Sequence, residues 1–322
     1  MDPQTIKQQA DRSLAGAHYE PRRLALLHTG AVVVLSLIVA LINYLLNFGM
    51  DSAGGLSGVA VRSVFASAQT ILSMASTFAL PFWQIGFLYA ALKYARGQQV
   101  GLPDLLEGFR RFGSVLRLTV LLLLVLIGVV LISANIASTL FMFSPASESV
   151  YLALEQMMEA NVEALTTEQL LAIAPQLNWV IVLNFIVILV LGLPIYYRFR
   201  LSEFSLMSGA PGALAAIRES VMLSRYRRMQ LFKFDLSIWW YYAIQLLIFL
   251  IASADMLLGL MGVTLPVNGT ALYWVLFAVS NLANLLFTWR FGAWYQTAYA
   301  HCYLKLKDWE EHPPQSVVEI PE

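Results

Sequence analysis

Charged residues are scarce in this sequence. Asp, Glu, Lys and Arg make up 12% of its 322 residues, whereas 59% are hydrophobic and the mean hydropathy is +0.67. A typical soluble domain is about 25% charged and about 45–50% apolar. The composition therefore excludes an ordinary soluble domain and indicates a chain surrounded by hydrocarbon. The formal net charge is zero, so nothing in the total favours nucleic acid as a partner.

Residue types that carry chemistry are just as scarce. Cys302 is the single cysteine, which excludes an intrachain disulfide and any metal site built from several thiolates. The histidines are scattered, and none stands four residues from another. The sequence has no Walker loop, no GxSxG and no HExxH. We therefore predict no catalytic residue, no metal site and no cofactor, in a protein that is not an enzyme.

Long apolar runs are what the sequence has in abundance. An α-helix rises ~1.5 Å per residue, so about 20 apolar residues cross a ~30 Å hydrocarbon core. Six runs are long enough, and they predict an all-α, polytopic membrane domain over residues 24–307. The predicted spans are 24–48, 64–92, 118–143, 179–197, 236–258 and 271–289.

Polar segments flank this predicted membrane domain. Residues 1–23 form a polar arm without a small-residue cleavage site, which favours a retained anchor over a signal peptide in the run that follows. Residues 308–322 are rich in Pro and Glu and predict a disordered tail.

Basic residues fall on one side of this six-span arrangement. Every lysine and arginine except Arg62 lies in the N-terminal arm, in the second or fourth connection, or at the C-terminal end. The connection 144–175 carries five glutamates and no basic residue. The positive-inside rule then places both termini in the cytosol and the acidic loop on the opposite side.

Polar side chains within the predicted spans are few. Gln84, Asn184 and Asn284 are three of them, and the spans contain almost no charge. Such residues serve most often as hydrogen bonds between helices. The alternative is a polar lining for a neutral solute, between spans bent at Pro81 and Pro194. A proton relay or an acidic sodium site at mid-membrane has no residues from which to form.

An amphipathic pattern follows the second predicted span. Its apolar side chains are Leu102, Leu105, Leu106, Phe109 and Phe112, with charged residues on the other side. This spacing predicts one helix that lies flat on the cytosolic membrane surface.

Two cytosolic connections each carry an arginine pair between larger apolar residues. The sequences FRRF at 109–112 and YRRM at 226–229 suggest that spans 2–3 and spans 4–5 are parallel repeats. Each basic residue near an anionic leaflet contributes roughly 1 kcal/mol of attraction. The residues predicted to contact lipid headgroups or a partner are Arg110, Arg111, Arg117, Arg198, Arg200, Arg218, Arg227, Arg228 and Lys233.

Several segments also share the pattern of a known family. They are YRFRL at 197–201, GALAAIRES at 212–220, RRMQLF at 227–232, DLSIW at 235–239, LLEGF at 105–109 and YAHCY at 299–303. Together they resemble domain-of-unknown-function family 975, a group of bacterial multi-span membrane proteins. The chain departs from the family pattern in the glutamate-rich connection 144–175 and at 224–226. The resemblance implies a helical fold in the bacterial cytoplasmic membrane, and it supplies no activity because the family has none assigned.

These patterns lead to two functional hypotheses. The first is a non-enzymatic scaffold or accessory factor, which binds anionic headgroups, or a cytosolic or membrane protein partner, through its basic cytosolic face. The second is a transporter or channel for a neutral or amphipathic small solute, which a polar cavity around Gln84, Asn184 and Asn284 would favour. An integral lipid enzyme is a third possibility, but it needs a carboxylate–histidine or metal cluster that the sequence does not supply.

Overall fold

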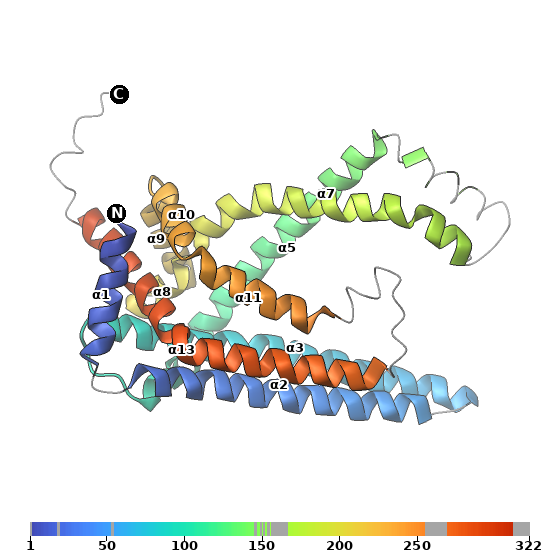
Figure 1. The fold of residues 1–322 in the computed structure, drawn as a ribbon, viewed down its shortest axis with the longest axis horizontal. Helices are drawn as coiled ribbons and strands as arrows, with labels where there is room; N and C mark the ends of the chain where they lie inside the picture. The colour runs from blue at the N-terminus through green and yellow to red at the C-terminus, as the bar shows by residue number, and fades with distance from the viewer. Residues whose placement is uncertain are drawn as a thin grey trace. The chain divides into compact units, whose positions relative to one another are not determined.

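The structure, a computed structural model, is all-helical over the residues that it describes. These residues are 2–17, 20–52, 55–144, 147–148, 150, 152, 155, 167–254 and 269–311. The elements are α1 (Pro3–Ala15), α2 (Pro21–Ser52), α3 (Gly55–Ala95), the 3-10 helix η1 (Leu102–Leu106), α4 (Glu107–Arg110), α5 (Phe112–Met142), α7 (Thr167–Phe199), α8 (Ser202–Ser208), α9 (Ala213–Ser224), α10 (Arg228–Ser237), α11 (Trp239–Ala252) and α13 (Gly269–Glu311) (Figure 1). The chain divides into two compact units, one made of residues 1–119 and 201–322 and the other of residues 120–200.

Three helical stretches are long and apolar enough to cross a membrane. They are Pro21–Leu46 in α2, Phe112–Met142, which is α5, and Val180–Ser208, which begins inside α7. A fourth crossing results if α10 and α11, which are bent by 69° at the break between them, count as one span. The three helices overlap the first, third and fourth predicted spans, and the bent pair overlaps part of the fifth. The helices α3 and α13 contain the other two predicted spans but do not meet the same criterion over the described residues.

The larger unit is built on the three long helices α2, α3 and α13. Each of the three packs against the other two, and Figure 1 shows them side by side in blue, cyan and red. Pro21 opens α2, a position where the fixed φ of proline fits a helix and its missing N–H costs nothing. The helix α8 packs on α3, and α11 packs on α13. The interior faces of five helices therefore meet in this unit.

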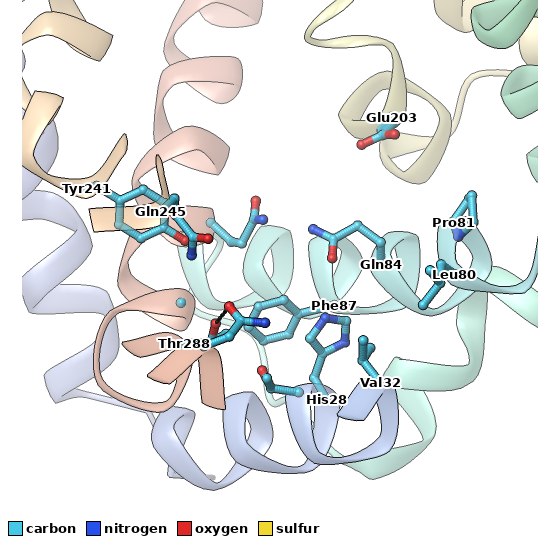
Figure 2. A pocket seen from close by; sticks show the side chains of 14 residues that line it. His28, Val32, Leu80, Pro81, Gln84, Phe87, Glu203, Tyr241, Gln245 and Thr288 are labelled. Carbon is cyan, nitrogen blue, oxygen red and sulfur yellow. Dashed lines mark hydrogen bonds between the residues drawn. The ribbon is translucent and has the colours of Figure 1, made fainter. Parts of the chain in front are cut away.

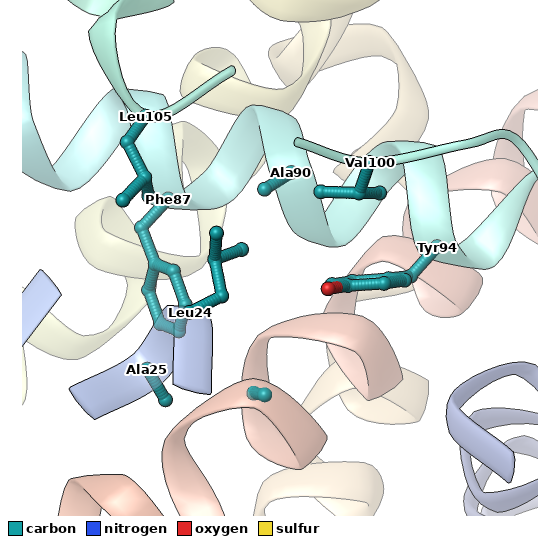
Figure 3. Close-up of a cluster of buried hydrophobic side chains, with 8 residues drawn as sticks. Leu24, Ala25, Phe87, Ala90, Tyr94, Val100 and Leu105 are labelled. Atoms are coloured by element: carbon teal, nitrogen blue, oxygen red, sulfur yellow. The ribbon is translucent and has the colours of Figure 1, made fainter. Parts of the chain in front are cut away.

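A cluster of buried side chains holds the three long helices together (Figure 3). Its members are Leu24, Ala25, Phe87, Ala90, Tyr94, Val100, Leu105 and Ala293. Burial of a large apolar side chain contributes about 1.5–3 kcal/mol. The cluster therefore fixes the start of α2, the second half of α3 and α13 against one another.

The N-terminal arm is a helix that packs on the larger unit. The carboxylate of Asp2 caps α1 by accepting hydrogen bonds from backbone N–H groups of its first turn. Ile6 and Ala10 are 0% exposed, because α1 contacts α13, α3 and α10. The Lys7 ammonium also donates a 2.7 Å hydrogen bond to the carbonyl oxygen of Ser237. The arm is thus a structural part of the unit.

The segment 102–112 differs from the predicted single helix. It forms the 3-10 helix η1 and the one-turn helix α4, and α5 begins at Phe112. Leu105 is buried, while the other apolar residues of the pattern remain exposed. The cause is backbone contact with α3, because a Cβ on Gly86 would lie 1.9 Å from the carbonyl oxygen of Leu105. A Cβ on Gly108 would likewise lie 1.9 Å from the carbonyl oxygen of Phe82. The segment therefore follows α3 instead of lying flat as one helix.

The smaller unit contains most of α5 and the whole of α7. Large apolar side chains on both helices are exposed within it, among them Leu124 (58%), Phe185 (61%) and Val190 (66%). Exposed large apolar side chains along a helix are suited to contact with lipid. The helix α7 begins at Thr167, so it includes the end of the predicted loop 144–175. Most of that loop, the end of the fifth predicted span and the tail after Glu311 lie outside the described residues.

Candidate functional site

A partly open cavity of about 560 Å³, lined by both polar and apolar side chains, lies in the larger unit between α2, α3, α8, α11 and α13, and we call it the polar cavity. Its polar lining consists of His28, Thr29, Gln84, Glu203, Gln245, Asn284, Thr288 and Gln296. Figure 2 shows the side chains of His28, Gln84, Gln245 and Thr288 arranged around the hollow. Polar groups among apolar helices are costly to bury, so their convergence on one cavity marks a candidate site.

The α2 wall of the cavity contains buried polar atoms without a partner. The imidazole of His28 stacks on Phe87 at a centroid distance of 4.4 Å, and the indole N–H of Trp83 donates a 2.9 Å hydrogen bond to the His28 carbonyl oxygen. Within the part of the chain that the structure describes, His28 Nδ1 and Thr29 Oγ1 form no hydrogen bond. Their residues are only 6% and 3% exposed. An unsatisfied buried polar group costs about 1–3 kcal/mol, so these two atoms make this part of α2 costly to pack without a partner.

The α13 wall presents a polar stripe. Asn284, Thr288, Gly292 and Gln296 are spaced four residues apart, and such positions lie on one face of a helix. The hydroxyl of Thr288 donates to Asn284 Oδ1 at 3.4 Å, the dashed line in Figure 2. A Cβ on Gly292 would lie 2.5 Å from Thr288 Cγ2, so the glycine leaves room for the threonine.

The α3 and α11 walls add two more carboxamides, Gln84 and Gln245. Each carboxamide offers two donor hydrogens and an acceptor oxygen. Pro81, inside α3, lines the same cavity and has no backbone N–H to donate. Glu203 is the charged residue of the lining, and its carboxylate disfavours anions. The arrangement therefore suits a neutral solute that both donates and accepts hydrogen bonds.

Two of the three predicted lining residues meet at this cavity. Gln84 and Asn284 come together from α3 and α13. Asn184 belongs to the smaller unit, where its Oδ1 is buried and forms no hydrogen bond with described residues. Sequence reasoning missed the role of Thr29 and Gln296. The four-residue spacing of polar and small residues along 284–296 was a signal from which Gln296 could have been found.

Arg111 and Arg227, two of the predicted surface residues, form hydrogen bonds within the larger unit. Arg111 donates to Glu107 Oε1 at 3.0 Å and to the carbonyl oxygen of Leu206 at 3.2 Å. Arg227 donates to the carbonyl oxygen of Leu306 at 3.0 Å, and its guanidinium stacks on a tryptophan ring. These two arginines hold helices together, which leaves less of their charge available for a partner.

The other predicted basic residues are spread over several elements. Arg110, Arg117, Arg218 and Lys233 are exposed in the larger unit. Arg228 is half-buried there, and its Nε forms no hydrogen bond with described residues. In the smaller unit, Arg198 is exposed, and the guanidinium of Arg200 lies 4.8 Å from the ring centroid of Tyr196.

A carboxylate that the sequence did not single out joins three helices of the larger unit. Glu219 of α9 accepts hydrogen bonds from Ser205 (2.5 Å), Tyr303 (2.8 Å) and Lys307 (3.2 Å). Burial acts to raise the pKa of Glu219, but these hydrogen bonds outweigh burial and the pKa lies below its ordinary value. Burial raises the pKa of Tyr303. The ionised Glu219 therefore ties α8 and α9 to α13.

Comparisons with known proteins found no relative of this chain. No protein-family model, no curated protein and no solved structure matches this chain. The resemblance to domain-of-unknown-function family 975 therefore stays a prediction. Within the described residues, no group of three or more His, Cys, Asp or Glu side chains is placed to hold a metal ion. The candidate site consequently rests on the geometry of the cavity alone.

Proposed function

We propose that this chain is a membrane protein that binds a neutral or amphipathic small solute in the cavity of the larger unit and conducts it across the bilayer. The observation that carries the proposal is the convergence of four carboxamides, those of Gln84, Gln245, Asn284 and Gln296, on one cavity between the helices. A volume of about 560 Å³ falls within the ~300–1,000 Å³ range of small-molecule sites. No catalytic step is assigned to the site.

The proposal includes six spans in a bacterial cytoplasmic membrane, with both termini in the cytosol. Its support is the one-sided distribution of lysine and arginine in the sequence and the apolar helices α2, α5, α7 and α11. In this orientation His28 lies within two turns of the cytosolic start of α2. The cavity then lies in the cytosolic half of the membrane, where a solute would enter from the cytosol or leave toward it.

The chemistry of the lining sets the expected solute class. Moving a charged solute into an apolar setting costs far more than moving a neutral one. Carboxamides replace the hydrogen bonds that a neutral solute makes with water. A hydroxyl- or amide-bearing solute therefore fits this site better than an ion.

Solute entry into proteoliposomes tests the proposal. The purified full chain is reconstituted, and the entry of erythritol, urea and glucose is followed by light scattering against protein-free vesicles. The wild-type chain is expected to accelerate entry of at least one probe. Asn284→Leu is expected to reduce that acceleration about fivefold, because a lost hydrogen bond is worth about 1 kcal/mol.

Asn281→Leu is the matched control for this test. Asn281 lies on the same helix, but its side chain donates to the carbonyl oxygen of Phe277 and does not line the cavity. Acceleration should survive this change. Equal losses in the two variants, or no acceleration of any probe by the wild-type chain, would contradict the proposal.

A second candidate function is favoured by the exposure of Arg110, Arg117, Arg218 and Lys233. In this alternative the chain is a scaffold or accessory factor that binds anionic headgroups, or a protein partner, through its basic cytosolic face. Each exposed basic residue would add roughly 1 kcal/mol of attraction to an anionic leaflet. Replacing all four by glutamine should lower the phosphatidylglycerol that co-purifies with the chain several-fold; unchanged lipid would exclude this role for them.

A further inference from the structure

A second cavity of about 560 Å³ lies at the junction of α1, the start of α2, α11 and α13. It has an aromatic wall and is separate in its lining from the polar cavity described above. The wall residues that matter are Trp240 of α11 and Trp289, Phe291 and Trp294 of α13. Neither hypothesis drawn from the sequence uses this cavity.

The aromatic wall is arranged to receive a cation. Trp240 packs against Phe291 at 5.0 Å and against Trp294 at 6.1 Å between ring centroids. A cation within about 6 Å of such a ring is attracted by the negative face of the ring, and tryptophan is the strongest partner. The wall already contacts a cation, since the guanidinium of Arg290 lies 5.1 Å from the centroid of Phe291. Ammonium groups therefore have a suitable surface here.

Charges of both signs line the same cavity, and one of its two arginines is Arg290, the residue beside Phe291. Glu20 is occupied by an ion pair with Arg23 at 2.8 Å. Asp11 and Arg22 also line the cavity, and neither forms an ion pair with the residues that the structure describes. A carboxylate and a guanidinium that both face one cavity are complementary in charge to a ligand that carries one positive and one negative group. A simple anion or a simple cation would pair with only one of them.

The position of the cavity points to the source of such a ligand. Tryptophan is enriched where a membrane meets water, because its ring is apolar and its N–H is polar. The apolar stretch of α2 begins at Pro21, which lines this cavity beside the polar Glu20 and Arg22. The cavity thus lies at the level where the phosphate and amine of a phospholipid lie.

We propose that this cavity binds the headgroup of a zwitterionic phospholipid. The ammonium group lies against Trp240 and Trp294 with Asp11 as its counter-charge, and the phosphodiester accepts hydrogen bonds from Arg22. The acyl chains extend from the cavity into the bilayer. This inference requires a membrane around the chain, but it does not depend on solute conduction through the other cavity.

Lipid retention measured by native mass spectrometry tests the inference. The full chain in detergent is titrated with phosphatidylethanolamine, phosphatidylcholine and phosphatidylglycerol. A zwitterionic lipid should bind at least tenfold more tightly than phosphatidylglycerol, and Trp240→Leu should remove that preference. Asp11→Asn should weaken the same preference several-fold. Because Asp11 is exposed, this variant is expected to fold, so the test remains informative even if Trp240→Leu does not fold.

Trp239→Leu is the matched control, since Trp239 is adjacent in α11, is 64% exposed and does not line the cavity. It should leave the preference unchanged. Equal retention of the three lipids by the wild-type chain, or an equal loss in the two tryptophan variants, would overturn the inference. Soluble phosphocholine is a further arm, and binding of this free headgroup as tight as that of the lipid would overturn the assignment to a membrane lipid.

Discussion

Gly86 in α3 lies so close to Leu105 in η1 that a Cβ on the glycine would be 1.9 Å from the leucine carbonyl oxygen. Real Cβ atoms do not approach a backbone oxygen so closely, so any side chain at position 86 forces two backbones apart. This contact seats the first cytosolic connection of the proposed topology on α3. The seating of η1 on α3 therefore requires glycine at position 86, just as the seating of α4 on α3 requires glycine at position 108.

Gly86→Ala should lower the free energy of unfolding by about 3 kcal/mol, because overpacking against a rigid backbone cannot be relieved by a side-chain rotation. Thermal unfolding in detergent measures the effect. Gly113→Ala is the control, because no atom lies within 4 Å of a Cβ at that position. It should change stability by no more than about 1 kcal/mol. Similar losses in the two variants would show that the close contact is not what matters.

The neighbouring arginines of the first connection should behave differently. Arg111→Gln should destabilise the chain by about 1–2 kcal/mol, because it removes the hydrogen bonds to Glu107 and to the carbonyl oxygen of Leu206. Arg110→Gln should cost less than about 0.5 kcal/mol, because the Arg110 side chain is 65% exposed and its ion pair with Glu107 is 3.5 Å long. Unfolding curves of the two variants check this. A larger loss at Arg110 would contradict the structure.

Glu219→Gln should lower stability by about 2 kcal/mol at neutral pH, because an ionised acceptor makes stronger hydrogen bonds than a carboxamide. The pKa of Glu219 is lowered on folding from 4.5, so the carboxylate stabilises the folded chain above that pH and loses its contribution as pH falls through the lower folded pKa. The gap between wild type and variant should therefore close on acidification.

Thermal unfolding of both proteins across an acidic pH series measures this gap. Glu310→Gln, an exposed site on the same long helix as Lys307, should show no gap at any pH. A gap for Glu219→Gln that persisted at the lowest pH would mean that charge is not its source.

Thr29→Val should raise the stability of the solute-free chain by about 1 kcal/mol, since it removes a buried hydroxyl that has no partner among the described residues. The same change should weaken solute conduction in the vesicle assay. Thr288→Val is the comparison, because the Thr288 hydroxyl donates to Asn284 and its loss should not stabilise. If Thr29→Val destabilised the chain, the hydroxyl would have a partner in the empty cavity.

Cysteine labelling checks the proposed orientation. Cys302 is 0% exposed, so the natural chain should react little with a membrane-impermeant maleimide. Glu148→Cys should be labelled in intact cells, and Arg218→Cys should be labelled only after lysis. The opposite pattern would reverse the topology and move the polar cavity to the other half of the membrane.

Apolar run length predicted the helical fold well, because hydrocarbon leaves a backbone few alternatives to a helix. It predicted less well where helices end in water. The pattern at 102–112 has helical spacing, but spacing carries no information about the close backbone contacts that Gly86 and Gly108 allow between this segment and α3.

Side-chain partners were harder to predict than helices. Gln84 and Asn284 were identified because a polar residue in an apolar span is conspicuous. Arg111 was expected to face outward, but a long side chain near a helix terminus reaches free carbonyl oxygens such as that of Leu206 in the last turn of α8. His28 and Thr29 became part of a site only through the packing of α2 on α3 and α13, which no local pattern records.

The helix α1 has a consequence for biosynthesis. Its hydrogen bond from Lys7 to Ser237 joins residues 230 positions apart, and α13 lies further along the chain. Contacts of α1 with α3 can form early in translation, whereas those with α10 and α13 can form only after these helices have been synthesised. The docking of α1 is therefore completed late in the synthesis of this unit.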